Sequence, residues 1–156
     1  MADGRLGQLR EFHLEHTSID DGGAAALSAA ECPALETVSI RTSRIGNDGL
    51  VALATSSRLP ALSTLQLRRG RVSGAALTAL ARRAAQLRCR YIDLRDNPLG
   101  GVEPAAIADL LAANPAFGLD LSACDLSPAL QEHLFRRFRG RVTVDPEVMA
   151  DVNRRV

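Results

Sequence analysis

A short run near the N-terminus contains residue types that bind metal ions, namely Glu11, His13, Glu15 and His16. Alternate side chains of an extended strand share a face, so the first three could together offer nitrogen and oxygen ligands to a divalent cation. No second cluster in the sequence supports this site, and His133 belongs to a distant segment with helical spacing. We therefore favour a chance polar patch and expect neither a metal nor a cofactor.

Two aspartates, Asp93 and Asp120, are well separated in the sequence and could act as paired carboxylates if the fold brings them together. General acid–base catalysis by such a pair requires a cleft in which the two carboxyl groups have different environments and therefore different pKa values. Whether the chain provides such a cleft depends on the elements that carry the two residues.

Three arginines, Arg41, Arg68 and Arg95, recur at one constant interval, with Arg69 and the single tyrosine, Tyr91, nearby in the sequence. The same interval separates Asp93 from Asp120. A guanidinium group makes bidentate contacts with carboxylates and stacks on aromatic rings. Arginine and tyrosine also dominate the energetic centres of protein interfaces. The arginines and the tyrosine therefore indicate binding, provided that the fold brings them to one surface.

Other functions lack support in the sequence. The pairs Gly22-Gly23 and Gly100-Gly101 have neither the lysine nor the spacing of a phosphate-binding loop. The formal net charge of +1 gives no global attraction to nucleic acid or to a membrane, and no apolar run reaches membrane-spanning length. Four further arginines are interpreted as solvated helix faces: Arg82, Arg83, Arg136 and Arg137. We expect binding to neither nucleic acid nor membranes.

The chain contains three cysteines, Cys32, Cys89 and Cys124, an odd number without a C-x-x-C pair. This usage disfavours the disulfide framework of a secreted protein, so we expect a reducing, cytoplasmic location. Each cysteine is interpreted as a small buried hydrophobic residue with a structural role.

Five similar segments position these residues. Their central apolar residues follow one another at a nearly constant interval and are Phe12, Val38, Leu65, Ile92 and Leu119. The segments begin near residues 9, 35, 62, 89 and 116, share the pattern L-x-x-L-x-L, and are followed by a shorter copy at Val142-x-Val144. Alternation of this kind predicts short strands with one buried face.

A second apolar run follows each predicted strand. It contains Leu27, Leu53, Leu80, Ile107 or Leu134, and neighbouring apolar residues have the i, i+3, i+4 spacing of one helix face. Potential helix caps precede four of the runs, at Asp21, Asp48, Ser73 and Ser127. Each unit therefore predicts a strand, a turn, a helix and a return loop.

The pattern resembles the leucine-rich repeat, L-x-x-L-x-L-x-x-N-x-L, at the long end of its period, and units with a full helix are similar to the ribonuclease-inhibitor type. The resemblance implies an α/β solenoid arc with parallel strands on the concave face and helices on the convex face. We expect one domain over residues 1–156, with about five full repeats and a C-terminal cap of strand and helix over residues 141–156. Nineteen arginines without a lysine, together with abundant alanine, indicate a GC-rich bacterial genome.

The sequence departs from the family at the asparagine position, which is occupied by Thr17, Ser43, Gly70, Asn97 and Cys124. In the family the asparagine side chain bonds to the backbone of the loop that follows the strand. Glycine has no side chain to make these bonds, so we expect a weakened turn at Gly70.

Residues beside the central apolar positions point away from the core of such an arc. The expected partner-binding residues on the concave face are Arg41, Arg68, Arg69, Tyr91, Asp93, Arg95 and Asp120. In the alternative interpretation this face is merely solvated, and its arginines and aspartates neutralise one another. Like charges at strand spacing repel, which favours an acidic counterpart. An open sheet desolvates Asp93 and Asp120 too little for catalysis, so we predict that the chain is not an enzyme.

The predicted ends of the arc differ. Residues 1–8 are too few to shield the first strand, so we expect either another chain or a preceding domain at that edge. The leading hypothesis is a non-catalytic protein–protein interaction module that binds a protein partner through its concave face. The alternatives are a substrate-recruiting C-terminal domain of a larger enzyme, such as a ubiquitin-ligase-like effector, and a structural self-associating module.

Overall fold

The computed structural model describes residues 6–155, in which strands and helices alternate along the chain. The strands are β1 (Glu11–Glu15), β2 (Thr37–Arg41), β3 (Thr64–Arg68), β4 (Tyr91–Asp93), β5 (Gly118–Asp120) and β6 (Val142–Thr143). The α-helices are α1 (Asp21–Ala29), α2 (Asn47–Ala54), α3 (Gly74–Arg82), α4 (Pro104–Ala113), α5 (Pro128–Arg137) and α6 (Pro146–Arg154). Two short 3-10 helices, η1 (Leu6–Gln8) and η2 (Ala84–Gln86), complete the set.

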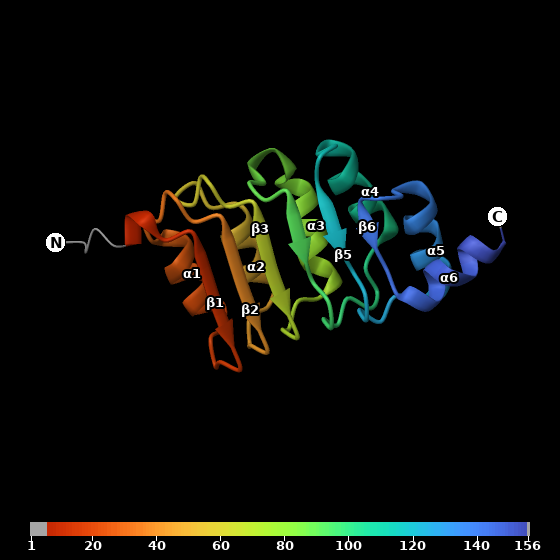
Figure 1. Cartoon of the computed structure of the whole chain (residues 1–156), viewed down its shortest axis with the longest axis horizontal. Coiled ribbons are helices and arrows are strands. Elements are labelled where there is room, and N and C mark those ends of the chain that lie inside the picture. Colours follow the sequence, from red (N-terminus) through yellow and green to blue (C-terminus); the bar gives the residue numbers. More distant parts are fainter. Residues whose placement is uncertain (1–5, 156) are drawn as a thin grey trace.

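The six strands form one parallel sheet in the order β1-β2-β3-β4-β5-β6. Parallel neighbours require a crossover connection, and helices α1 to α5 supply one between each pair of consecutive strands (Figure 1). The helices lie on one side of the sheet, and its other side remains open (Figure 1). This arrangement fits an α/β arc of the leucine-rich-repeat kind.

The strand register stacks equivalent positions of successive units. Phe12 pairs with Val38, Val38 with Leu65, Leu65 with Ile92 and Ile92 with Leu119, as the sequence pattern predicts. The side chains of this column point toward the helices, and from Val38 onward they are buried. The sequence pattern predicts Ala116 as the first buried residue of the fifth repeat, but Ala116 is exposed. The adjacent Phe117 is buried instead and fills this part of the apolar layer with a larger side chain.

Each of the first five strands is followed by a residue with left-handed backbone conformation. The φ values are +50° at His16, +56° at Thr42, +51° at Arg69, +60° at Asp96 and +55° at Ala123. Residues other than glycine adopt this conformation at a cost of roughly 1–3 kcal/mol, so surrounding contacts must stabilise the turns.

The turn at Gly70 is stabilised by the next unit, which corrects our expectation that it is weak. The side-chain Oδ1 of Asn97 accepts hydrogen bonds from the backbone N–H of Gly70 (3.2 Å) and Val72 (3.1 Å). Its Nδ2 donates to the carbonyls of Leu67 (2.6 Å) and Leu94 (2.8 Å). A Cβ at position 70 would lie 3.1 Å from Asn97 Oδ1, so the missing side chain leaves room for the asparagine.

Bonds between neighbouring units also cap two helices. Asp20 caps its own helix α1, whereas Oδ1 of Asp21 accepts from the N–H groups of Gly46 (2.7 Å) and Gly49 (3.0 Å) at the start of α2. Likewise, Oδ1 of Asn47 accepts from the backbone N–H of Ser73, the residue before α3, at 2.8 Å. The first turn of each helix is thus stabilised by the preceding helix, because a carboxylate or amide oxygen satisfies otherwise unpaired N–H groups.

The C-terminal end of the sheet is closed. Helix α6 packs against α5, and Val142, Val144 and Val152 are buried. The Asp145 carboxylate accepts bonds from Ala123 N–H (2.6 Å) and from the Gln131 side chain (2.8 Å). These contacts fasten the last strand and helix to the units before them.

We predict that Asn97→Ala lowers the free energy of unfolding by about 2–4 kcal/mol, because it leaves several buried backbone groups without partners. The matched control is Thr17→Ala at the same position of the first turn, where Thr17 accepts a single bond from Ile19 N–H at 3.3 Å. We expect a loss below about 1 kcal/mol for the control. Urea unfolding followed by circular dichroism measures both, and equal losses would contradict the role of Asn97.

The three cysteines are buried and unpaired. Burial raises the pKa of the Cys89 and Cys124 thiols to about 12, so almost no thiolate is present at pH 8. We predict that a colorimetric disulfide reagent at pH 8 detects no thiol in the folded chain and three in denaturant. Rapid reaction of the native protein would show that these side chains are accessible.

Candidate interaction surface on the open face of the sheet

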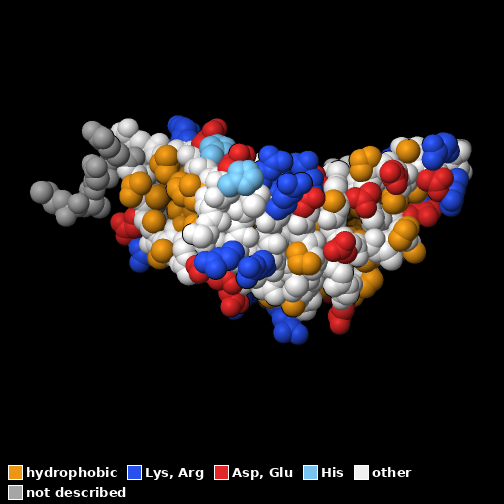
Figure 2. Space-filling model, turned by 90° about the horizontal axis from the view of Figure 1, so that it is seen from below, with side chains coloured by type: hydrophobic (Ala, Val, Ile, Leu, Met, Phe, Trp, Pro, Cys, Tyr) orange, Lys and Arg blue, Asp and Glu red, His pale blue; other side chains and the backbone are white. Residues whose placement is uncertain are grey.

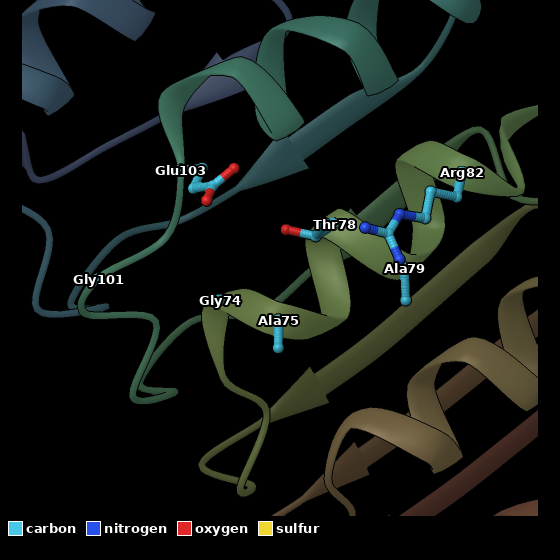
Figure 3. Close-up of a pocket in the computed structure, with 7 residues that line it drawn as sticks. All are labelled: Gly74, Ala75, Thr78, Ala79, Arg82, Gly101 and Glu103. Carbon is cyan, nitrogen blue, oxygen red and sulfur yellow. The ribbon is translucent and has the colours of Figure 1, made fainter.

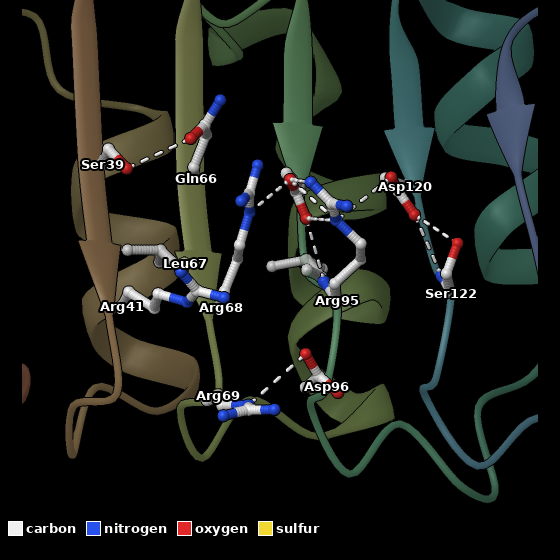
Figure 4. A network of polar contacts seen from close by, with 12 residues as sticks. Ser39, Arg41, Gln66, Leu67, Arg68, Arg69, Arg95, Asp96, Asp120 and Ser122 are labelled. Carbon is white, nitrogen blue, oxygen red and sulfur yellow. Dashed lines mark hydrogen bonds and ion pairs between the residues drawn. The ribbon is translucent and has the colours of Figure 1, made fainter. Parts of the chain in front are cut away.

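The open face carries the residues that we expected to contact a partner (Figure 4). Arg41 and Arg68 are the last residues of β2 and β3 and stand opposite each other in the register. Tyr91 and Asp93 lie in β4, with Arg95 two residues beyond it, and Asp120 pairs with Asp93 in the register. The parallel register therefore brings residues from several segments together at the middle of the sheet.

Asp93 lies beneath two arginines and is 0% exposed. Its carboxylate accepts from Arg68 Nε at 2.7 Å, from Arg95 Nη2 at 2.8 Å and from the backbone N–H of Arg95 at 3.1 Å. We expected this aspartate to be available to a partner. Its side chain points to the open face, as predicted, but the long side chains of Arg68 and Arg95 cover it. Asp93 therefore positions these two arginines.

Asp120 is also buried. Its carboxylate contacts Arg95 Nε at 3.3 Å and accepts from the hydroxyl of Ser122 at 2.7 Å and from its backbone N–H at 3.0 Å. Figure 4 shows Arg95 between the two aspartates, with Asp120 linked onward to Ser122. Arg95 is therefore held from both sides.

The contacts within this network favour its charged state. Burial raises the pKa of Asp93, but hydrogen bonds from Arg95 and then from Arg68 outweigh burial, and the net pKa lies below its ordinary value. The hydrogen bond to Asp93 raises the pKa of Arg95 further above its already high value. The Asp93 carboxylate and the Arg95 guanidinium group are thus charged at neutral pH.

Tyr91 is half-buried and lies beside Gly118 of β5. A Cβ at position 118 would be 3.4 Å from Cδ2 of the tyrosine ring, so glycine at this position leaves space for the ring. Burial, followed by the negative charges of Asp120 and Asp93, raises the pKa of Tyr91. The phenol is therefore neutral at physiological pH and presents an amphipathic ring to the open face.

Arg41 and Arg69 are held less firmly than the other two arginines. Arg41 forms an ion pair with Glu15 at 3.8 Å, and Arg69 one with Asp96 at 3.6 Å, all on exposed side chains. Because Arg69 occupies a left-handed turn, it lies below the Arg68–Arg95 network in Figure 4, outside the row formed by the other arginines.

The arginines of the open face have acidic neighbours within the chain itself. Each of the four arginines has a carboxylate neighbour, provided by Glu15, Asp93, Asp96 and Asp120. The charges balance in number, but two of the carboxylates are buried beneath the guanidinium groups. Within this network the guanidinium groups of Arg68 and Arg95 are consequently more exposed than the Asp93 and Asp120 carboxylates, and Figure 2 shows basic side chains at the middle of the molecule.

Arg141 immediately precedes β6, and its function is structural. Its Nε donates to the carbonyl of Phe117 at 3.1 Å, and its Nη2 donates to the carbonyls of Leu111 and Asn114 near the end of α4. A cationic side chain at a helix C-terminus also interacts favourably with the helix dipole. The register alone did not reveal this role, because it depends on the path of the return loop.

The two carboxylates of the open face are engaged by neighbouring side chains. Asp93 accepts from Arg68 and Arg95, and Asp120 accepts from Ser122 and contacts Arg95. A depression lined by Gly74, Thr78, Arg82 and Glu103 lies on the helical side, between α3 and α4, remote from these carboxylates (Figure 3).

The N-terminal polar run is a surface patch in which His13 Nε2 lies 3.1 Å from Glu11 Oε2. Among residues 6–155, no three His, Cys, Asp or Glu side chains come together in a way that could hold a metal ion. In the same part of the chain, no helix has the length and apolarity required to cross a bilayer.

We predict that Asp93→Asn lowers the free energy of unfolding at pH 7 by about 2–3 kcal/mol, because it removes the charge that holds Arg68 and Arg95. The pKa of Asp93 is depressed in the folded state, so its contribution is complete above the unfolded pKa of about 3.9 and is lost as the pH falls further. Urea unfolding at pH 7 and pH 2.5 should therefore show a difference between wild type and variant that narrows in acid.

Asp96→Asn is the matched control for that experiment. Asp96 is exposed, pairs with Arg69 at 3.6 Å, and has a left-handed conformation that asparagine also tolerates. A change within about 1 kcal/mol is expected. A difference between wild type and Asp93→Asn that stays constant down to pH 2.5 would contradict the charged state of Asp93.

Comparison with known proteins agrees with the fold. The family model of the leucine-rich repeat matches residues 9–28, a range that covers β1, the turn and most of α1. No curated protein matches the chain. Domains built from such repeats commonly mediate protein–protein interaction and are typically non-enzymatic. The match supports a leucine-rich repeat protein.

Proposed function

We propose that the chain is a non-catalytic protein–protein interaction module that binds an acidic segment of a protein partner on the open face of its sheet. Arg41, Arg68, Arg69, Tyr91 and Arg95 make the contacts. Asp93 and Asp120 position the arginines from beneath and do not touch the partner.

The observation that carries this proposal is the clamp of Arg68 and Arg95 on the buried Asp93 carboxylate. An ordinary surface arginine loses rotamer freedom when it binds, which costs roughly 0.5–1.5 kcal/mol per side chain. Here the folded chain has already fixed the two guanidinium groups. A partner carboxylate therefore meets donors whose positions are set in advance.

The unused donors favour an acidic partner. Within residues 6–155 only the Nε–H of Arg68 is hydrogen-bonded, which leaves the N–H donors on its two Nη atoms for a carboxylate. The ring of Tyr91 stands on the next strand and supplies apolar contact area beside this charge. A combination of aromatic and arginine side chains at a surface centre is typical of an interface hot spot.

The proposal includes the finer features expected from the sequence. These are a ribonuclease-inhibitor-like solenoid of about five repeats in one domain over residues 1–156, a bacterial source, a cytoplasmic location, and partners that are proteins and not nucleic acid or membranes. An alternative is that the same face recruits a substrate for a larger enzyme. Self-association is a second alternative, and sedimentation at several concentrations distinguishes it.

Selection of random peptides displayed on phage against the immobilised chain tests the proposal. We expect the selected peptides to be enriched in aspartate and glutamate. The double variant Arg41→Glu/Arg69→Glu should bind a selected peptide about tenfold or more weakly, because each reversal replaces attraction by repulsion. These two arginines are chosen because neither supports Asp93, so the fold is preserved.

Arg82→Glu/Arg137→Glu is the matched control, since it makes the same charge change on the helical side. Its affinity for the selected peptide should equal that of the wild type. Selected peptides without acidic residues, or equal effects of the two double variants, would overturn the assignment to the open face.

A further inference from the structure

The two edges of the sheet differ. At one end β6 has two residues, and the apolar layer behind it is closed by Val142, Val144 and Val152. At the other end β1 has five residues, and within residues 6–155 no strand lies beside its outer edge. An uncovered edge strand presents a row of backbone donors and acceptors to any segment that can pair with it.

The hydrogen-bond pattern identifies the backbone groups that point outward. In the next strand, the N–H of Thr37 donates back to Arg10, and the carbonyl of Arg41 accepts from His16. Glu11 and Glu15 occupy the same register positions in β1. Their N–H and C=O groups, with those of His13 between them, are therefore directed to the side where a further strand would pair.

The apolar layer behind this edge is incomplete. Phe12 and Leu14 are only partly buried, whereas Val38 and Ile40, their partners in β2, are 0% exposed. Leu6 is the one large hydrophobic residue of the described chain that is exposed, at 50%. Figure 2 shows hydrophobic side chains gathered at this N-terminal end. A segment added here would bury apolar side chains beside Phe12 and Leu14.

The charges at the edge determine what kind of segment fits. Glu11, His13 and Glu15 are exposed on the open face of β1. Two copies of β1 paired antiparallel about His13 would place Glu11 opposite Glu15 twice, and like charges in that position repel. On its inner side, by contrast, Glu15 already faces Arg41 of β2 at 3.8 Å. Basic residues therefore complement the edge, and a second copy of the same strand does not.

We propose that the outer edge of β1 binds an extended segment of another protein in which basic and apolar residues alternate, as an additional strand of the sheet. The basic side chains of the segment face Glu11 and Glu15, and its apolar side chains enter the layer beside Phe12 and Leu14. This site is separate from the arginine surface at the middle of the sheet and binds the opposite charge.

Fluorescence anisotropy with capped, labelled peptides and the full chain tests this inference. The probe is GRVSIRG, whose centre copies the Val-Ser-Ile of β2, and the comparison peptide is GEVSIEG. We expect the basic peptide to bind at least about tenfold more tightly at low salt, since two attractive cross-strand pairs replace two repulsive ones. In NMR spectra the amide signals of Glu11, His13 and Glu15 should shift on binding.

Two controls separate strand pairing from simple charge attraction. The same basic peptide with N-methyl groups on its valine, serine and isoleucine keeps every side chain but cannot donate from these backbone positions in either strand direction, so its affinity should fall at least about fivefold if the backbone pairs. The variant Glu11→Arg/Glu15→Arg should prefer the acidic peptide. Binding at β1 is read from the shifts of its amide signals, so contact of the acidic peptide with the arginine surface is not counted. Equal shifts of the β1 amides with the basic and acidic peptides, equal binding of the N-methylated peptide, or dimers that protect the β1 amides without peptide would each overturn the proposal.

Discussion

The parallel register between neighbouring strands is the constraint on which the rest of the structure depends. Each strand is paired with the strand of the next repeat unit, so equivalent positions of successive units lie side by side. A shift of one residue would exchange the buried and open faces. The register that buries the column from Val38 to Leu119 is therefore the same register that sets Arg41 beside Arg68 and Asp93 beside Asp120.

Hydrogen bonds between units reinforce this register at the ends of the elements. Asn97 bonds to the turn before it, Asp21 to the start of the following helix, and Arg141 to the end of α4 in the preceding unit. Such bonds satisfy backbone groups that an isolated unit would leave unpaired. A single strand–helix unit is consequently incomplete, and its stability depends on its nearest neighbours.

The sequence predicts the features that depend on periodicity. Apolar spacing locates the strands, the helices and the closed C-terminal end, because burial recurs at fixed positions in every unit. It does not predict that Asp93 is buried, because alternation assigns a side chain to a face and not to a depth, and the depth depends on the arginines beside it. Nor does it reveal that Gly70 and Asn97 complement each other, since that contact joins two units through a particular turn geometry.

Arg95 and Arg68 use their N–H donors to different extents within the fold. Arg95 uses its Nε and Nη2 atoms on Asp93 and Asp120, so two of its guanidinium nitrogens are engaged within the fold. Arg68 uses its Nε alone and directs its remaining donors away from Asp93. A buried carboxylate shared by two arginines thus fixes both, and Arg68 keeps more free donors than Arg95. In the proposed function, the charge that is presented to a partner comes from the network that stabilises the sheet, so protonation or loss of Asp93 would affect stability and recognition together.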